Sequence, residues 1–261
     1  MSRRPLSSFW LLLGLLTGGY LLFIVAMLAA TASYSTPAKL FEALGSREIR
    51  FSIVLSLATC TASALLSLLL AVPVGYLLSR GRFHGKALLD AAVDIPIVLP
   101  PMVVGLCLLI LFQTPLGRWT DDHMLRFTYT VYGVVLAQCV IGAAFAIRTM
   151  RGTFDHLSSR PEDVAMTLGC TRGQAVWLVS LPAAKRGMFA AASIAWARSL
   201  GEFGPILVFA GATRMKTEVL PTSVWLELSV GNLEAAVAVS LLMVAMAMLV
   251  LGAVRVAGER V

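Results

Sequence analysis

Two charged residues lie within a stretch, residues 187–212, that is otherwise apolar and rich in small side chains. Arg198 and Glu202 are four positions apart, so a helix would place them on one face. Charges in such a stretch are costly in lipid and usually face a bundle interior or a water-filled cavity. They can line or gate a path, with Arg198 favouring an anion and Glu202 tuning it. They can equally pair with each other and fix helix packing where two copies meet, and the sequence leaves both interpretations open.

Neighbouring residues in this stretch have small side chains that allow close packing. Gly201 and Gly204 permit either the close approach of another helix or a local bend. We therefore count them, with Arg198 and Glu202, among the candidate residues of a path or gate.

A second unusual stretch, residues 148–186, is polar and lies between apolar segments. Its sequence predicts a helix that begins near Pro161, with Ser159 as the cap. Glu162 and Asp163 then lie in the first turn, where carboxylates interact favourably with the positive end of the helix. The stretch therefore has the pattern of a folded element that docks onto another protein.

The same pattern continues with a predicted turn and a second short helix. Val164 and Ala165 contribute a small apolar face, and Gly169 is expected to end the first helix as a C-terminal cap. The second helix is predicted from about Arg172 to Ser180, with its end at Leu181-Pro182. Two short helices that meet at a glycine form a compact knob that another protein can approach closely.

The composition of the chain predicts that most of it lies in a membrane. Hydrophobic residues make up 58% and charged residues only 13%, whereas soluble domains have about 25% charged residues. Spanning a bilayer takes roughly 20 apolar residues, and lipid requires that the backbone form helices or closed barrels. Six spanning helices are predicted: residues 10–30, within 51–79, 92–112, 127–147, 187–212 and 235–254.

The basic residues predict the orientation of the chain. The net charge is +7, and we attribute it to the flanks of the membrane segments and not to nucleic-acid binding. An even number of spans places both termini on one side. With both termini in the cytoplasm, more Lys and Arg residues fall inside than outside, as membrane proteins prefer. The stretch 148–186 is then cytoplasmic, and the protein is expected in the inner membrane of the cell.

The first apolar run has two interpretations. Ser2-Arg3-Arg4 followed by apolar residues, with Ala30-Thr31-Ala32 at the end, has the pattern of a cleavable signal peptide. The run is longer than a typical signal-peptide core, so a retained helix is the prediction. The four cysteines have no ligand or disulfide spacing, and we expect small buried side chains and no metal site: Cys60, Cys107, Cys139 and Cys170.

Prolines interrupt the third predicted span at Pro96, Pro100 and Pro101. They can break the helix, which a membrane tolerates only where the break is buried or lines a cavity, or they can mark a helix start. Pro100 and Pro101 join the candidate residues of the path under the first interpretation. Asp94, just before them, is expected to be a helix-start residue.

The polar stretch resembles the EAA loop of permease subunits of ABC importers, whose pattern is E-A-A, three residues, G, nine residues, I-x-L-P. Here it is matched by Asp163-Val164-Ala165, Gly169 and Val179-Ser180-Leu181-Pro182. Asp replaces Glu, Val replaces Ala and Val replaces Ile, and Glu162 can supply the longer carboxylate. The resemblance implies that the first helix docks in a groove of an ATP-hydrolysing subunit. We name residues 148–186 the coupling loop.

The resemblance extends from about residue 51 to residue 254. The third span, the segment Thr114-Pro115-Leu116-Gly117-Arg118, and residues 197–204 with the sequence A-R-S-L-G-E-F-G are similar to molybdate and sulfate permeases. This implies an oxyanion as the transported substrate, with molybdate or tungstate ahead of sulfate or thiosulfate.

The resemblance also implies an organisation. We expect an all-α polytopic membrane protein with the type I (MetI-like) permease fold. Residues 1–261 would form one transmembrane domain, with a core at 51–255. The expected partners are a second copy of the chain, two ATPase subunits, an extracytoplasmic substrate-binding protein and membrane lipid.

The chain itself is not expected to be an enzyme or to bind a cofactor. It has no phosphate-binding G-x-x-x-x-G-K-[ST] pattern, so ATP and Mg²⁺ would be used by the partner. An ion-driven secondary transporter is one alternative, although no internal repeat is evident. A membrane scaffold or sensor that binds an ATPase without transport is another.

Overall fold

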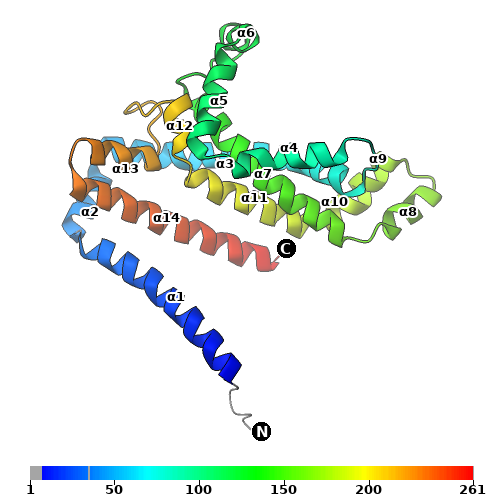
Figure 1. Ribbon diagram of the computed structural model, residues 1–261, viewed down its shortest axis with the longest axis horizontal. Coiled ribbons are helices and arrows are strands. Elements are labelled where there is room, and N and C mark those ends of the chain that lie inside the picture. Colours follow the sequence, from blue (N-terminus) through cyan, green and yellow to red (C-terminus); the bar gives the residue numbers. More distant parts are fainter. Residues whose placement is uncertain (1–7, 35, 261) are drawn as a thin grey trace.

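The computed structural model describes residues 8–34 and 36–260, and within these ranges every regular element is a helix (Figure 1). The predicted all-α class is confirmed, while the basic Ser2-Arg3-Arg4 start lies outside the described residues. The elements are α1 Ser8–Ser33, α2 Pro37–Gly45, α3 Arg47–Arg80, α4 Lys86–Val98, α5 Pro101–Gln113, α6 Pro115–His123, α7 Val131–His156, α8 Arg160–Thr167, α9 Arg172–Ala175, the π-helix η1 Val176–Ser180, α10 Leu181–Ala183, α11 Lys185–Leu200, α12 Gly204–Phe209, α13 Leu220–Ser229 and α14 Leu233–Arg260.

The number of continuous spans is smaller than the six predicted. Among the described residues, four helical stretches are long and apolar enough to cross a membrane: Phe9–Ser33, Arg47–Arg80, Val131–His156 and Leu233–Val250. A fifth span exists if α4 and α5 are counted together, although a bend of 112° separates them. The prediction was made from summed apolarity, which does not register a change of direction within an apolar run.

The bend between α4 and α5 has its cause in the prolines. Leu99 adopts an extended conformation, as residues before proline do, and Pro100 is the N-cap of α5. Pro101 is the first residue of α5, where the missing N–H costs nothing. Both interpretations of this segment are therefore realised, since α4 ends and a differently directed helix begins. Pro96 lies inside α4.

The fifth predicted span, residues 187–212, is also broken. α11 has 16 residues and ends at Leu200, and α12 begins at Gly204. The three residues between the two helices include the buried Glu202. A change of helix axis in the middle of an apolar segment is tolerated in a membrane protein where the backbone is covered by protein.

The centre of the molecule is formed by α3, α7 and α11, which pack against one another. α3 contributes small hydroxyl residues at intervals of three or four, so that they line one face of the helix. All of them are buried: Ser52, Ser56, Thr59, Ser63 and Ser67. Small side chains let helices approach closely, and their hydroxyls are satisfied within the bundle, as in the 2.9 Å contact between Ser63 and Ser199.

Different helices form the two ends of the molecule. In Figure 1, α8 and α9 lie at one end, and α2 and α13 lie at the other. α5 and α6 project away from the bundle, and α1 diverges from it. Residues 213–234 include α13, and Val219 and Leu220 are fully buried, because α13 packs on α14 and α3.

Candidate functional site

The first helix of the coupling loop, α8, forms as predicted, with Pro161 in its first turn and Glu162 and Asp163 near its start. The predicted cap by the Ser159 side chain does not form. The Ser159 side chain makes no capping hydrogen bond, and its backbone is helical, whereas capping residues usually have an extended backbone. Only the backbone oxygen of Ser159 is used, and it accepts from the Asp163 N–H at 3.1 Å.

Glu162 faces the body of the protein and is only 6% exposed. Ser180 donates a hydrogen bond to Oε1 at 2.6 Å, and Tyr76 donates one to Oε2 at 2.9 Å. The Arg80 guanidinium lies 3.7 Å from Oε1. A buried carboxylate needs partners of this kind to offset its lost hydration. Glu162 therefore joins α8 to α3 and to η1, while the neighbouring Asp163 is the exposed carboxylate of the pair.

Gly169 ends α8 as predicted, and the backbone shows why glycine is required. Its φ is +96°, in the left-handed region that other residues avoid. The Gly169 N–H bonds to the Met166 carbonyl and the Cys170 N–H bonds to the Ala165 carbonyl, both at 3.1 Å. This pair of bonds is the Schellman arrangement, which satisfies the last carbonyls of a helix. The direction of the chain after α8 is thus determined locally.

The second helix of the coupling loop begins where predicted but does not end at Leu181-Pro182. Thr171 and Gln174 form a capping box at its start. Helical structure then continues through α9, η1 and α10, and α11 follows directly at Lys185. Pro182 is accommodated in the first turn of α10, directly after the π-helix η1. The wider π turn and Pro182 are both typical of a local change in helix geometry.

The outer surface of the coupling loop carries exposed apolar side chains. Val164 and Leu168 on α8 are four residues apart, so they lie on one face, and they are 57% and 81% exposed. Trp177 and Leu178 on η1 are exposed as well. Leu181 is partly buried against the hydrophobic core that contains Phe154, and Ala165 is half-buried. The predicted residues therefore divide into an inward group that anchors the loop and an outward group that a partner can cover.

The intramembrane charges form the ion pair that the sequence allowed. Arg198 Nη2 lies 2.5 Å from Glu202 Oε1, and Glu202 is 2% exposed. The guanidinium also lies over the Phe145 ring, 5.1 Å from its centroid. The Arg198 side chain remains 39% exposed. Pairing explains how Glu202 is tolerated in an apolar region, while part of the Arg198 side chain stays exposed.

The bend in the third apolar segment lies against the break after α11. A side chain on Gly204 would come within 3.0 Å of Met102 and 3.3 Å of Pro101, and one on Gly105 would come within 2.7 Å of Pro205. The close approach predicted for Gly204 is confirmed. A side chain on Gly201 would meet nothing closer than 3.9 Å, so this glycine permits no close approach and lies at the end of α11.

Two ion pairs between α4 and α7 were not predicted from the sequence. Asp94 is not a helix-start residue: it lies inside α4 and pairs with Arg148, and Asp90 pairs with Arg151. The i, i+4 spacing of Asp90 and Asp94 was the available signal, because it places both on one face. Nothing in the sequence singled out Tyr76 as a partner of Glu162.

Comparison with known proteins identifies the family of the chain. Residues 65–261 match the family described as the inner membrane component of binding-protein-dependent transport systems. The chain therefore belongs to this family, and it is a multi-pass permease of an ABC transporter with the MetI-like fold.

Some relatives are named for molybdenum, molybdate or tungstate, and others are named for sulfate. A probable molybdenum ABC transporter permease of Haloferax volcanii is 34% identical over 89% of this chain and 84% of its own length. The molybdate/tungstate permease WtpB of Pyrococcus abyssi is 39% identical over 59% of this chain and 58% of its own length. The sulfate permease CysT of Escherichia coli is 30% identical over 96% of this chain and 92% of its own length.

A solved structure has the same fold. A bacterial alginate ABC transporter, crystallised with its alginate-bound periplasmic protein, has a chain that matches with a TM-score of 0.75. The match covers 98% of this chain and 96% of that chain, at 16% identity. At this identity the likeness establishes the fold alone.

Proposed function

We propose that this ABC permease imports an oxyanion, with molybdate or tungstate as the favoured substrate, and that a separate ATPase supplies the energy. Two relatives of 34% and 39% identity are named for molybdenum or for molybdate and tungstate. Sulfate is the second candidate, because CysT is similar over nearly the whole chain. The exposed part of the Arg198 side chain is suited to attract an anion, while its pairing with Glu202 prevents tight capture.

The observation that carries the coupling proposal is the continuity between the coupling loop and the intramembrane charges. The helical stretch that begins at Thr171 runs through η1 and α10 and leads into α11, which carries Arg198. Glu162 fastens the first helix of the loop to α3 and η1. A displacement of the coupling loop therefore moves both α3 and α11, which lie at the centre of the molecule.

The proposed mechanism is alternating access in a homodimer with two ATPase subunits inside and a substrate-binding protein outside. ATP binding closes the ATPase pair, which moves the two coupling loops together, and the attached helices turn to open outward. The anion enters from the binding protein and is released inward after hydrolysis. Both termini and the coupling loop are cytoplasmic in this arrangement.

The docking role is tested by charge reversal of the exposed carboxylate. Asp163→Lys is expected to abolish most ATP-dependent uptake with only a small fall in melting temperature, because Asp163 is exposed and its side chain forms no hydrogen bond or ion pair among the described residues, while its interaction with the start of α8 contributes less than about 1 kcal/mol. Asp163→Glu is the matched control and should retain uptake. Normal uptake by Asp163→Lys would contradict docking at this surface.

The substrate is tested by labelled molybdate uptake into vesicles that contain the permease, its ATPase and its binding protein. Uptake that requires ATP and is blocked by tungstate but not by sulfate is the expected result. Competition by sulfate would move the substrate to the second candidate. ATPase binding without any flux would instead indicate a scaffold or sensor.

A further inference from the structure

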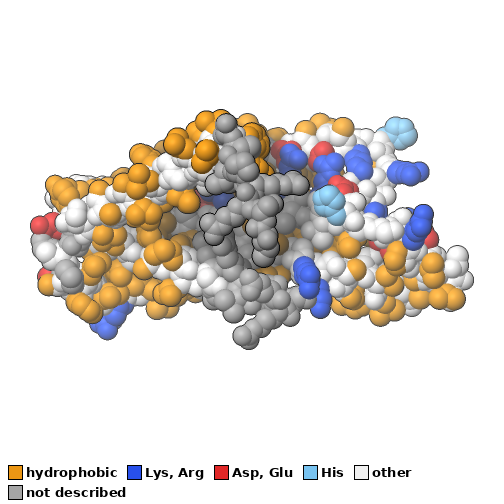
Figure 2. All heavy atoms as spheres, turned by 90° about the horizontal axis from the view of Figure 1, so that it is seen from below, with side chains coloured by type: hydrophobic (Ala, Val, Ile, Leu, Met, Phe, Trp, Pro, Cys, Tyr) orange, Lys and Arg blue, Asp and Glu red, His pale blue; other side chains and the backbone are white. Residues whose placement is uncertain are grey.

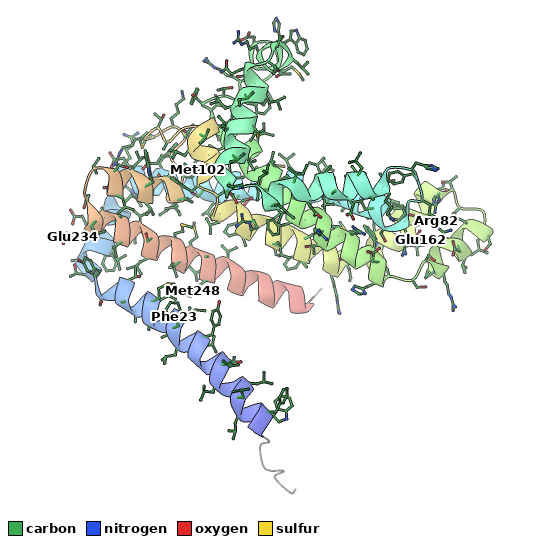
Figure 3. All side chains as sticks on the ribbon, in the orientation of Figure 1. Phe23, Arg82, Met102, Glu162, Glu234 and Met248 are labelled. Carbon is green, nitrogen blue, oxygen red and sulfur yellow. The ribbon has the colours of Figure 1, made fainter. Side chains whose placement is uncertain are left out.

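A cavity of about 810 Å³ lies where α3, the turn after it and the coupling loop meet. It is not part of the anion path, which we place at Arg198. Its lining includes four cationic side chains, Arg80, Arg82, Lys86 and Arg172, but only two carboxylates, Glu162 and Asp163. Figure 2 shows Lys and Arg side chains gathered toward this end of the molecule, and Figure 3 shows Arg82 and Glu162 close to each other there. The cavity therefore has an excess of positive charge.

The carboxylates of this cavity neutralise its cations only in part: Arg80 is paired with Glu162, at 3.7 Å. Both oxygens of Glu162 already accept hydrogen bonds from Tyr76 and Ser180. Within the described part of the chain, Arg82 forms no hydrogen bond or ion pair, and the buried Nε of Arg80 has no hydrogen-bond partner. The Lys86 ammonium contacts only the Gly81 carbonyl, at 3.2 Å. The Arg82 guanidinium and the Lys86 ammonium are therefore available to an external anion, whereas Arg80 is held by Glu162 and by the Leu157 carbonyl.

The position of the cavity and its rim indicate what kind of anion fits. α3 has 34 residues, so it is about 51 Å long at 1.5 Å per residue, whereas the hydrocarbon core is about 30 Å thick. The cavity begins where the apolar part of α3 ends, at the level expected for lipid headgroups. Leu77, which lines the cavity, is 45% exposed, and Phe83 beside it is 40% exposed. Cationic donors beside exposed apolar side chains match a molecule with an anionic head and an apolar tail.

We propose that this cavity binds the phosphate headgroup of an anionic phospholipid, with an acyl chain along Leu77 and Phe83. Basic pockets between membrane helices commonly bind such headgroups. Because Arg80, Arg82 and Lys86 lie at the α3–α4 turn while Ser159 and Arg172 belong to the coupling loop, a bound phosphate connects the two. The lipid then stabilises the loop in its position against α3. Only the assignment to the cytoplasmic leaflet rests on the proposed function.

The test uses the purified full-length permease without an ATPase, so that its outcome is independent of cargo and coupling. The delipidated protein is titrated with phosphatidylglycerol or with phosphatidylcholine of the same acyl chains, and bound lipid is counted by native mass spectrometry. Phosphatidylglycerol is expected to bind with higher affinity. The double variant Arg82→Gln/Lys86→Gln should bind it roughly 30-fold more weakly, from the loss of two cations.

Two controls decide between the possible outcomes. The matched double variant Arg118→Gln/Lys216→Gln removes two exposed cations outside the cavity and should bind phosphatidylglycerol like the wild type. Inorganic phosphate and molybdate, titrated calorimetrically in neutral detergent, should not bind at this site. Equal binding of the two lipids, or unchanged binding by the Arg82→Gln/Lys86→Gln variant, would overturn the proposal. If phosphate or molybdate bound to the wild type but not to the Arg82→Gln/Lys86→Gln variant, the ligand of the cavity would be a free anion and not a lipid headgroup.

Discussion

The two ends of α3 are both joined to the rest of the molecule through a buried carboxylate, but the carboxylates have different surroundings. At the coupling end, both oxygens of Glu162 accept hydrogen bonds, and Arg80 lies nearby. At the other end, Glu218 accepts a hydrogen bond from Ser223, which also contacts Ser52 of α3 at 3.0 Å. The second oxygen of Glu218 is buried and has no hydrogen-bond partner among the described residues.

This difference indicates that the coupling end is built to hold a carboxylate and the other end only tolerates one. Burial raises the pKa of Glu218, because the lost hydration outweighs its bond to Ser223 and the attraction of Arg214. The connection at that end is supplemented by a backbone contact, from the Leu220 N–H to Ser56 at 2.8 Å. The coupling end also has a contact with backbone, from the Arg80 guanidinium of α3 to the Leu157 carbonyl at 2.6 Å, but α8 itself is joined to α3 through the Glu162 side chain.

The largest effect is expected when the carboxylate of the coupling end is removed. Glu162→Ala leaves the Tyr76 and Ser180 hydroxyls without their acceptor, which should lower the free energy of unfolding by about 2–3 kcal/mol. It should also reduce ATP-dependent uptake, because α8 is no longer fastened to α3. Thermal melting and vesicle uptake measure the two effects.

The matched variant Glu162→Gln sharpens this result. It retains the size of the side chain and an acceptor oxygen, so its destabilisation should be less than half as large. If Glu162→Ala melted at the temperature of the wild type, the assignment of the connection to this side chain would be wrong.

A smaller effect is expected at the turn that directs α8. Gly169→Ala places a side chain in open space but forces a left-handed backbone on alanine, at a cost of about 1 kcal/mol. Gly173→Ala is the control, because its side chain also meets nothing and Gly173 lies in α9, where alanine is favoured. Chemical denaturation of both variants should show a loss only for Gly169→Ala. Equal stability would mean that the turn relaxes without cost.

The smallest effect is expected at the other end of α3, and it depends on pH. The pKa of Glu218 is raised above its ordinary value of 4.5, so the folded protein binds the proton more tightly than the unfolded chain. The stability contributed by this group is present below that value and is lost as pH rises through the raised pKa. Glu218→Gln removes this loss.

The measurement for Glu218 is the melting temperature of the wild type and of Glu218→Gln across this pH range. The difference between them should move in favour of the variant as pH rises above about 4.5. A difference that does not change with pH would show that the Glu218 carboxylate titrates alike in both states.

The sequence alone determined the features whose causes are local. The apolar composition requires helices in lipid, Gly169 ends α8 through its own backbone conformation, and the spacing from Asp163 to Pro182 indicates the family. The Arg198–Glu202 pair was also predictable, because only four positions separate the two charges. Each of these follows from composition or from residues in one short stretch of the sequence.

Tertiary structure decided the features whose partners are distant in the chain. The sequence gives no sign that Glu162 faces inward, because its partner Tyr76 is 86 residues away. The pairing of Asp94 with Arg148 and the contact of Gly204 with Pro101 arise in the same way. Apolarity determines that a segment enters the membrane. The direction of its helices, and whether a polar side chain faces the interior, depend on which helices pack together.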